Sequence, residues 1–180
     1  MHGTESPSDW VKKWAHLAQP DSLVLDIACG AGRHMQLFKQ MGHRCTGIDR
    51  SAEALSHANA YGQVLEADIE SGPWPLEGQQ YDVVVVTNYL WRPLMPRILE
   101  SIAPGGLLIY ETFSAGNEKV GKPSKPDFLL KPGELLQTFA PLRVIAFEDG
   151  YWGETPKYVQ RIVAVHQVHD SDRQFGLSCR

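Results

Sequence analysis

A glycine-rich turn near the start of the chain most constrains its fold. Residues 22–27 are mainly apolar, and the turn that follows them contains two glycines, Gly30 and Gly32, spaced Gly-x-Gly. A second apolar run, residues 45–48, ends in Asp49, nineteen positions after Gly30. This order of strand, glycine-rich turn, helix, strand and acidic residue is typical of one half of a nucleotide-binding α/β fold. The segment therefore predicts a ligand site at the turn.

Composition narrows the class of protein. At 180 residues, with 43% hydrophobic and 21% charged residues, the chain is long enough for one domain with a sizeable core. It has no apolar stretch approaching the roughly 18 residues that a membrane span needs. Its three cysteines are widely separated, so we expect no metal site and a reducing, cytoplasmic setting. A formal net charge of −4 gives no general attraction to nucleic acid, which is not an expected partner.

Hydrophobic periodicity and turn residues divide the chain into alternating strands and helices. The pattern predicts strands over residues 22–27, 44–48, 63–65, 83–86, 107–110, 142–147 and 158–165. It predicts helices over residues 9–18, 31–41, 51–60, 94–102 and 134–139, a tight turn at 104–106 and a long polar loop at 114–132. We expect an α/β fold with a doubly wound, Rossmann-like sheet of seven strands, mostly parallel with the last strand antiparallel, and helices on both faces.

Ligands of such sheets bind at the carboxyl ends of the strands. Polar segments that follow the expected strand ends should therefore share one rim. These segments are residues 26–32, Asp49, Asp68, residues 88–92 and residues 111–113.

Details of the turn narrow the kind of ligand. Met35 stands where a dinucleotide fold has its third glycine, and no Gly-Lys-Ser/Thr segment is present to form a phosphate-binding loop. Asp26 lies four residues before Gly30, where a carboxylate would be a poor neighbour for a pyrophosphate. It would suit a ligand with a positive charge near the glycines, such as a sulfonium that carries an α-amino group.

The segment that contains Asp26 and Gly30 resembles motif I of the class I S-adenosylmethionine (SAM)-dependent methyltransferases. Residues 47–51 resemble the second motif of this family, and residues 66–69 resemble the third. Further segments resemble the approach to strand four, the turn before strand five and the helix before the last strand pair: residues 74–76 with 81–84, residues 102–107, and residues 128–136. Within the superfamily, the small size is most similar to the tellurite-resistance-type methyltransferases.

The sequence pattern predicts a helical segment at 1–21 and a polar tail at 167–180, and the resemblance implies a methyltransferase domain at 22–166. It implies SAM as the cofactor, with S-adenosylhomocysteine as the product. In this family pattern Asp26 would contact the methionine amino group, Asp49 the ribose hydroxyls and Asp68 the adenine. The other implied cofactor residues are Ala28, Gly30, Gly32, Arg50, Ile69 and Asn88.

From the residues alone, simpler interpretations of these positions stay open. Asp26 could cap a helix or loop, and Asp49 could be a solvated strand end. Asp68 could be an exposed loop acid, and His34 could face solvent rather than a ligand.

The methyl acceptor is expected beyond the fourth and fifth strands. We expect Tyr89, Arg92 and Glu111 as candidate catalytic residues, with Arg92 binding an anionic group and Tyr89 or Glu111 assisting with a proton. Tyr89 could instead be a plain aromatic of the core or surface, and Arg92 a solvated residue at a helix start. Trp10 and Trp14 would pack against the domain or form a lid over the cofactor.

Absences in the loops after these strands narrow the chemistry. Methyl transfer from a sulfonium is an in-line displacement, so a base is needed only when the acceptor arrives protonated. No histidine occurs between His57 and His166, which rules out a histidine base from these loops. No Asn-Pro-Pro-Tyr segment follows strand four, which disfavours adenine-N6 or glutamine methylation. No cysteine lies in the same loops, which disfavours covalent cytosine chemistry.

We therefore expect a small-molecule methyltransferase that acts mainly by proximity and orientation, as a monomer or homodimer. One alternative is an RNA or protein methyltransferase that recognises its target through residues 114–132 and Arg92. In a simpler interpretation, the lysines of that loop only form a solvent-exposed surface. Another alternative is a SAM-binding partner subunit without its own activity.

Overall fold

The computed structural model describes residues 6–167, so the predicted tail lies almost wholly outside the described residues. The strands are β1 (Leu23–Ile27), β2 (Arg44–Asp49), β3 (Gln63–Glu66), β4 (Tyr81–Thr87), β5 (Ile102–Phe113), β6 (Arg143–Trp152) and β7 (Lys157–Val165). The α-helices are α1 (Asp9–Trp14), α2 (Arg33–Gln40), α3 (Ala52–Ala58), α4 (Met95–Glu100) and α5 (Glu134–Thr138). Short 3₁₀ helices are η1 (Ala15–Leu17), η2 (Arg92–Leu94), η3 (Asn117–Lys119) and η4 (Pro126–Phe128). Over this part of the chain, no helix has the length and apolar character that crossing a membrane would take.

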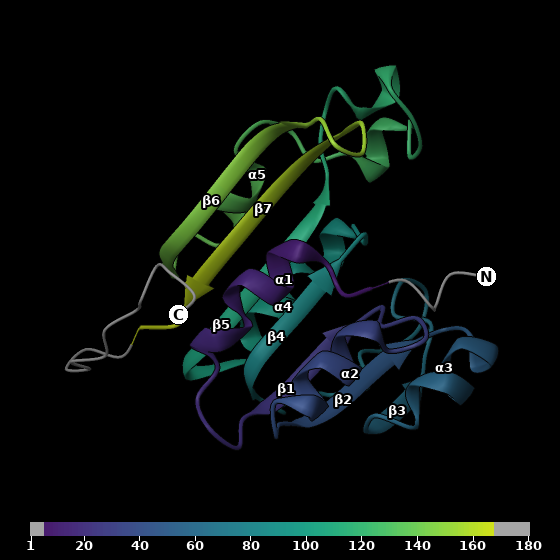
Figure 1. Ribbon diagram of the computed structural model, residues 1–180, viewed down its shortest axis with the longest axis vertical. Helices are drawn as coiled ribbons and strands as arrows, with labels where there is room; N and C mark the ends of the chain where they lie inside the picture. The colour runs from purple at the N-terminus through teal and green to yellow at the C-terminus, as the bar shows by residue number, and fades with distance from the viewer. Residues whose placement is uncertain (1–5, 168–180) are drawn as a thin grey trace.

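All seven strands form one sheet with the order β3-β2-β1-β4-β5-β7-β6 (Figure 1). Parallel pairing joins β3, β2, β1, β4 and β5, whereas β7 runs antiparallel to both of its neighbours. This confirms the predicted Rossmann-like sheet with its last strand antiparallel. The chain first builds outward from β1 through β2 and β3 and then returns to the other side of β1 with β4. Such a reversal leaves a crevice at the carboxyl ends of the strands, where ligands of α/β sheets bind.

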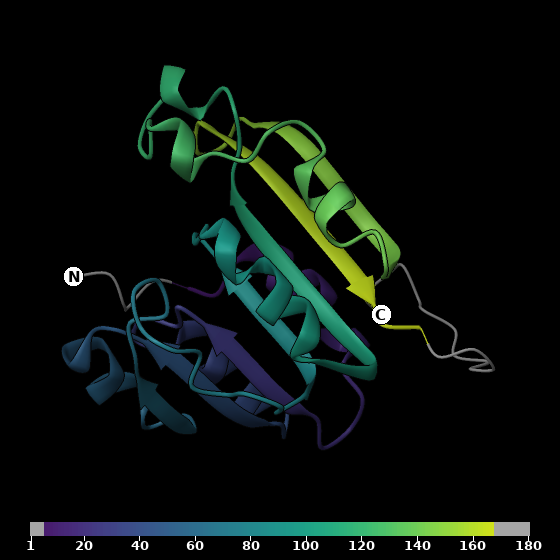
Figure 2. The same cartoon turned by 180° about the vertical axis from the view of Figure 1, so that it is seen from behind.

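Helices cover both faces of the sheet, and each face has its own apolar core (Figures 1 and 2). On one face, helices α1, α2 and α3 bury side chains such as Trp14, Phe38 and Leu55. On the other face, α4 and α5 bury side chains that include Ile98 and Leu135. Successive residues of a strand point to opposite faces. The unbroken valine run at 83–86 is therefore buried on both sides, and all four residues are 0% exposed.

The predicted tight turn at 104–106 is wrong, because these residues belong to β5. The register between β4 and β5 shifts between Tyr81 and Val83, where β5 has extra residues. Gly105 adopts a φ of +79°, and its backbone N–H donates to the carbonyl of His166 just beyond β7 (2.6 Å). The glycine thus lets the strand bulge, and the end of β7 satisfies the bulged backbone.

The N-terminal helix is held against the domain. The hydroxyl oxygen of Ser8 caps α1 by accepting the backbone N–H of Trp10 (3.1 Å). Trp10 and Trp14 are 3% and 4% exposed, and their ring centroids lie 5.7 Å apart in an edge-on arrangement. Their place in the structure is therefore core packing rather than a lid.

The polar loop at 114–132 is folded onto the domain by one buried side chain. Asn117 donates from Nδ2 to the carbonyl of Pro123 (2.9 Å) and accepts at Oδ1 the backbone N–H of Tyr158 at the start of β7 (3.1 Å). The lysines of this loop, Lys119, Lys122 and Lys125, are exposed.

Gly32, immediately before α2, is a position where the packing of two helices can be tested. Its φ is +81°, and a Cβ there would lie 2.9 Å from both Cα and Cβ of Ala58 in α3. We expect Gly32→Ala to lower the free energy of unfolding by about 2–4 kcal/mol, because left-handed strain adds to a clash. Urea denaturation measures this change.

Gly42→Ala is the matched control, because Gly42 has a similar φ of +89° but nothing within 4 Å of the added Cβ. That variant should lose only the strain, about 1–2 kcal/mol. Equal losses in the two variants would contradict the proposed contact between α2 and α3.

Candidate active site

The glycine-rich turn after β1 is a tightly folded segment with unusual backbone angles. Ala28 and Gly30 both have a φ of 55°, and Gly32 follows in the same left-handed region. The backbone N–H of Cys29 donates to the carbonyl of Ile48 in β2 (2.9 Å). A left-handed alanine costs free energy, and such strain is often found where a backbone must approach a ligand.

Asp49 at the end of β2 anchors this turn. Its Oδ2 accepts the backbone N–H of Gly30 (2.8 Å), and its Oδ1 accepts the backbone N–H of Ser51 ahead of α3 (2.9 Å). A carboxylate has about four acceptor positions, so two remain for a ligand. Asp49 can therefore hold the turn and bind a hydroxyl pair at the same time.

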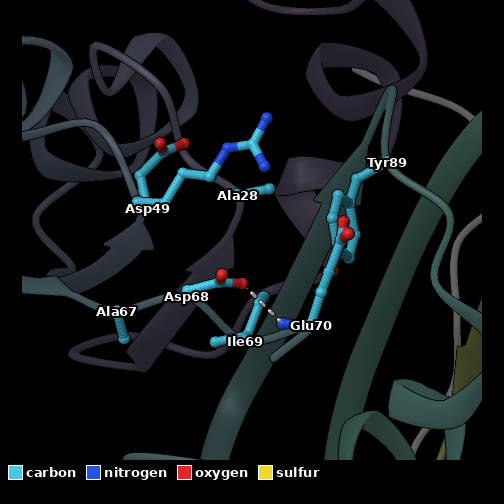
Figure 3. Close-up of a pocket in the computed structure, with 8 residues that line it drawn as sticks. Ala28, Asp49, Ala67, Asp68, Ile69, Glu70 and Tyr89 are labelled. Atoms are coloured by element: carbon cyan, nitrogen blue, oxygen red, sulfur yellow. Dashed lines mark hydrogen bonds between the residues drawn. The ribbon is translucent and has the colours of Figure 1, made fainter. Parts of the chain in front are cut away.

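A first pocket of about 450 Å³ lies beside the turn, at the carboxyl ends of β1, β2 and β3. It is lined by the predicted cofactor residues Ala28, Asp49, Arg50, Asp68 and Ile69, together with Ala67, Glu70 and Tyr89 (Figure 3). Oδ1 of Asp68 accepts the backbone N–H groups of Glu70 (3.0 Å) and Ser71 (3.2 Å), which hold the pKa of this carboxyl below its ordinary value. The acids predicted from separate strand ends thus meet in one pocket.

Tyr89, predicted as a catalytic residue, lines this first pocket opposite the two aspartates (Figure 3). Its hydroxyl is buried and has no hydrogen-bond partner among the described residues. Burial raises the pKa of the Tyr89 hydroxyl, and the nearby negative charge of Glu70 raises it further. The hydroxyl therefore stays protonated and can donate a hydrogen bond, but it is a poor base.

Asp26 lies in β1 just before the turn. It lines neither the first pocket nor the second pocket described below. The residue is 1% exposed, and neither carboxyl oxygen has a hydrogen-bond partner within residues 6–167. Burial raises its pKa to about 8, against the positive charge of Arg33, which lowers it. An unpartnered buried carboxyl is costly, and this one stands where the sequence predicts a contact with a cationic group.

His34, in the first turn of α2, is buried beside Asp26 rather than facing solvent. Its Nδ1 lies 3.8 Å from Oδ2 of Asp26, and its Nε2 accepts the backbone N–H of Ser8 (3.2 Å). Burial lowers the pKa of His34 to about 3, so the ring is neutral. Because Nε2 is the acceptor, the hydrogen bond places the ring proton on Nδ1, which faces Asp26.

A second pocket, of about 800 Å³, lies at the carboxyl ends of β4 and β5. Asn88 and Glu111 line it from these strand ends, and further walls come from residues 6–9 and from the turn between β6 and β7. Glu111 is 4% exposed, accepts the hydroxyl of Ser8 at Oε1 (2.8 Å) and pairs with Arg161 (Nε to Oε2, 2.5 Å).

Arg161 is a site residue that sequence reasoning missed. It lies in β7 directly opposite Glu111, is 5% exposed and stacks over the ring of Trp152 (4.4 Å from the centroid). The adjacent Gln160 and Arg161 inside the otherwise apolar run at 158–165 could have indicated this role, because a charged residue in a buried strand usually has a partner of opposite charge.

Arg92, predicted to bind an anionic substrate group, has a different role in the structure. Its guanidinium forms a two-pronged pair with Glu134 of α5 (2.6 and 2.9 Å) and donates to the carbonyls of Asp127 (2.9 Å) and Leu129 (2.8 Å). These contacts hold the pKa of Arg92 above its ordinary value. They use four of the five guanidinium N–H groups, and Arg92 lines neither pocket. The prediction is therefore corrected: Arg92 clamps the loop and α5 to the segment after β4.

The described residues, 6–167, contain no group of three or more metal-ligating side chains. Cys29 and Cys45 are buried thiols.

Solved structures with the same fold are methyltransferases. TehB from Haemophilus influenzae superposes with a TM-score of 0.74 at 19% identity, over 90% of this chain and 63% of TehB. A SAM-dependent methyltransferase from Methanosarcina mazei superposes with a TM-score of 0.69 at 14% identity, over 92% of this chain and 100% of that one. These likenesses establish the fold.

Curated relatives are also methyltransferases, and this chain spans less than half of their length. Malonyl-[acyl-carrier protein] O-methyltransferase from Pectobacterium atrosepticum is 32% identical over 102 residues, which are 52% of this chain and 40% of the relative. Trans-aconitate 2-methyltransferase from Paracidovorax citrulli is 35% identical over 98 residues, 48% of this chain and 37% of the relative. Ribosomal protein L11 methyltransferase from Burkholderia mallei is 35% identical over 103 residues, 54% of this chain and 33% of the relative.

The clamp made by Arg92 predicts a loss of stability rather than a loss confined to acceptor binding. We expect Arg92→Ala to lower the free energy of unfolding by about 1–3 kcal/mol, the range for hydrogen bonds to charged groups at a partly exposed site. Arg97→Ala is the control, because Arg97 makes only exposed pairs with Glu77 and Glu100 and should change stability by about 0–1 kcal/mol. Chemical denaturation of both variants decides, and an Arg92→Ala protein as stable as the wild type would contradict the clamp.

The match to a family model agrees with the fold and with the pocket beside the glycine-rich turn. Residues 24–106, from β1 into β5, match the model described as a methyltransferase domain. The resemblance predicted from the sequence is thereby confirmed. Residues 24–106 thus match a methyltransferase-domain model, within a chain that has the fold of solved SAM-dependent methyltransferases.

Proposed function

We propose that this protein is a SAM-dependent methyltransferase that transfers the methyl group to a small-molecule acceptor. The observation that carries the proposal is the first pocket. Residues predicted as cofactor ligands from three separate strand ends, among them Ala28, Asp49 and Asp68, line one cavity. Chance placement of these acids would not bring them to a common space beside a glycine-rich turn.

The first pocket has the groups that the adenosine part of SAM requires. Asp49 retains acceptor positions for the two ribose hydroxyls, which form charge-assisted hydrogen bonds with a carboxylate. Asp68 and Ile69 lie on the side proposed for the adenine ring, with Arg50 beside them. Tyr89 closes the opposite side.

The methionine part of SAM would extend from the first pocket toward the second. The same two segments border both pockets: Ala28 and Tyr89 line the first, whereas Arg33 and Asn88 line the second. Asp26 precedes the turn in β1, and its carboxyl, which has no hydrogen-bond partner among the described residues, fits a cationic amino group. When bound, SAM supplies an electrophilic methyl group next to a sulfonium.

The chain's own residues orient the two substrates and exclude water. Asn88 and Glu111 wall the acceptor pocket from the strand ends. Ser8 also lines it, and it donates its backbone N–H to His34 and its hydroxyl to Glu111. Such positioning accounts for much of the rate of an in-line displacement. A small acceptor is supported by the name of one relative, trans-aconitate 2-methyltransferase, whereas another is named for malonyl-[acyl-carrier protein].

Two alternative functions would give different results in the test described below. A protein or RNA acceptor is favoured by the ribosomal protein L11 methyltransferase among the relatives and by the exposed lysines of the 114–132 loop. A partner subunit without activity would bind SAM and show no turnover. We further propose a cytoplasmic monomer or homodimer, with residues 22–166 as the catalytic domain.

The test combines calorimetric SAM binding with S-adenosylhomocysteine formation on panels of small acceptors, RNA and ribosomal protein. We expect SAM binding and turnover on small acceptors. Absence of SAM binding would overturn the proposal, and turnover confined to RNA or protein would select the first alternative.

A substitution of Asp49 tests the ribose contact. We expect Asp49→Ala to weaken SAM binding by about 1.5–3 kcal/mol, the range for hydrogen bonds to a charged group. Asp49→Asn keeps one acceptor oxygen for the turn and should bind SAM with an intermediate affinity. Glu66→Gln, at the exposed end of β3, is the control and should bind like the wild type. A folded Asp49→Ala protein with unchanged calorimetric affinity would remove Asp49 from the site.

The buried carboxyl of Asp26 predicts that SAM affinity depends on pH. With a pKa of about 8, ligand-free Asp26 is protonated at neutral pH, whereas a neighbouring ammonium group favours the carboxylate. Binding below pH 8 then releases this proton, so affinity should rise about tenfold per pH unit between roughly pH 6 and 8 and level off above. Asp26→Asn should remove this dependence, leaving only that of SAM itself. Parallel calorimetric profiles for the two proteins would exclude Asp26 from the contact.

A further inference from the structure

We propose that the second pocket takes a small organic acid and that the protein methylates it on a carboxylate oxygen, giving a methyl ester. This inference rests on the proposed function and names the acceptor class that the proposed function leaves open. Three features of the second pocket support the inference: the lack of a strong base in its lining, the charges of that lining, and the segments of the chain that form its walls.

Among the side chains that line the second pocket, only carboxylates could accept a proton from an acceptor, and a carboxylate is a weak base. The lining, within the described residues, contains no histidine, cysteine or tyrosine; Asp9 is paired with Lys12 and Glu154 is exposed. The carboxylate of Glu111 is already engaged by the guanidinium of Arg161 (2.5 Å) and by the hydroxyl of Ser8 (2.8 Å). His34 is turned away, since its two nitrogens face Ser8 and Asp26.

This lack of a strong base separates the acceptor classes. Amines arrive largely protonated at neutral pH, and alcohols and most thiols also carry a proton, so each needs a base before it can attack. A carboxylic acid has a pKa near 4 and arrives as the anion. An acceptor that arrives already ionised therefore suits this pocket best.

The charges that line the pocket leave Lys157 to meet an anion. The lining carries charges of both signs, namely the cations Lys12, Arg33, Lys157 and Arg161 and the carboxylates Asp9, Glu111 and Glu154. Asp9 pairs with Lys12 (2.5 Å) and Glu111 with Arg161, which cancels two of each sign. Lys157, half-buried at the start of β7, forms no ion pair within residues 6–167, although Asp9 lies near enough for its carboxyl to sense the charge of Lys157. It is the cation best placed to receive an acid.

The walls of this pocket come largely from outside the part of the chain that matches the family model. Residues 6–12 and the segment 152–161 contribute most of the lining, whereas the match covers residues 24–106. These walls are mostly polar, with Pro7 and Trp152 as exceptions. A short polar acid fits such a lining better than a long acyl chain does.

The step balances without a proton or a further reagent. A lone pair of the carboxylate oxygen forms the new O–C bond, and the C–S bond breaks with its electron pair remaining on sulfur. The anion and the sulfonium become a neutral ester and a thioether. Lys157 would act as a specificity-determining residue that holds the acid, and it takes no part in bond changes.

The first test uses the full chain with SAM and a panel of short mono-, di- and tricarboxylic acids, matched with amines and thiols of the same size. We expect S-adenosylhomocysteine with at least one acid, together with a product that releases methanol in mild base, as a methyl ester does. Turnover with amines or thiols but no acid would overturn the inference, and so would calorimetric SAM binding without methylation of any acid. Absence of SAM binding would overturn the proposed function itself.

The second test isolates Lys157. With the best acid, Lys157→Gln should raise KM about tenfold with kcat changed less than threefold, and Lys157→Arg should restore KM. Calorimetric binding of the acid to the S-adenosylhomocysteine complex should weaken in parallel, while SAM affinity stays unchanged. Lys125→Gln, in the exposed loop, is the control for removing a surface charge and should leave both quantities as in the wild type. An unchanged KM in Lys157→Gln would overturn the assignment of Lys157.

Discussion

The two oxygens of Asp49 each accept one backbone N–H, from Gly30 in the glycine-rich turn and from Ser51 ahead of α3. This carboxylate therefore fixes the turn after β1 relative to the end of β2. Gly32 can then approach Ala58 closely enough for α2 and α3 to pack over one face of the sheet. The first pocket depends on these positions, because its lining comes from the ends of β1, β2 and β3.

Ser8 makes the corresponding connection at the second pocket. Its backbone N–H donates to His34 of α2, and its hydroxyl donates to Glu111 of β5. One residue before α1 thus links the helix that follows the turn to the strand end across the sheet. Because His34 faces Asp26 and Glu111 faces Arg161, the link continues to both buried acids. The second pocket therefore depends on the docking of a segment that lies outside the part matched by the family model.

Local patterns in the sequence were enough to predict the sheet and the first pocket. The positions of Asp49 and Asp68 follow from short apolar runs, and parallel strands bring such strand ends to one rim. The roles of Arg92 and Arg161 depend on partners 42 and 50 residues away, Glu134 and Glu111, and no local pattern identifies those partners. The prediction of a tight turn at 104–106 was wrong for the same reason. A proline and two glycines favour a turn locally, but pairing with the end of β7 keeps this segment in β5.

The buried charges support a site more strongly than they support the fold. Glu111 and Arg161 are both about 5% exposed, and removing such a pair from water costs several kcal/mol per ion before their attraction compensates. An apolar pair between β5 and β7 would stabilise the sheet at least as well. Asp26 is a second costly group, because both of its oxygens lack a partner among the described residues. Both costs fall at the carboxyl ends of the strands, at or near the two pockets. Buried polar groups that lower stability at one edge of the sheet are expected of a site for charged ligands. A cationic methyl donor and an anionic acceptor would each need a fixed group of opposite charge nearby.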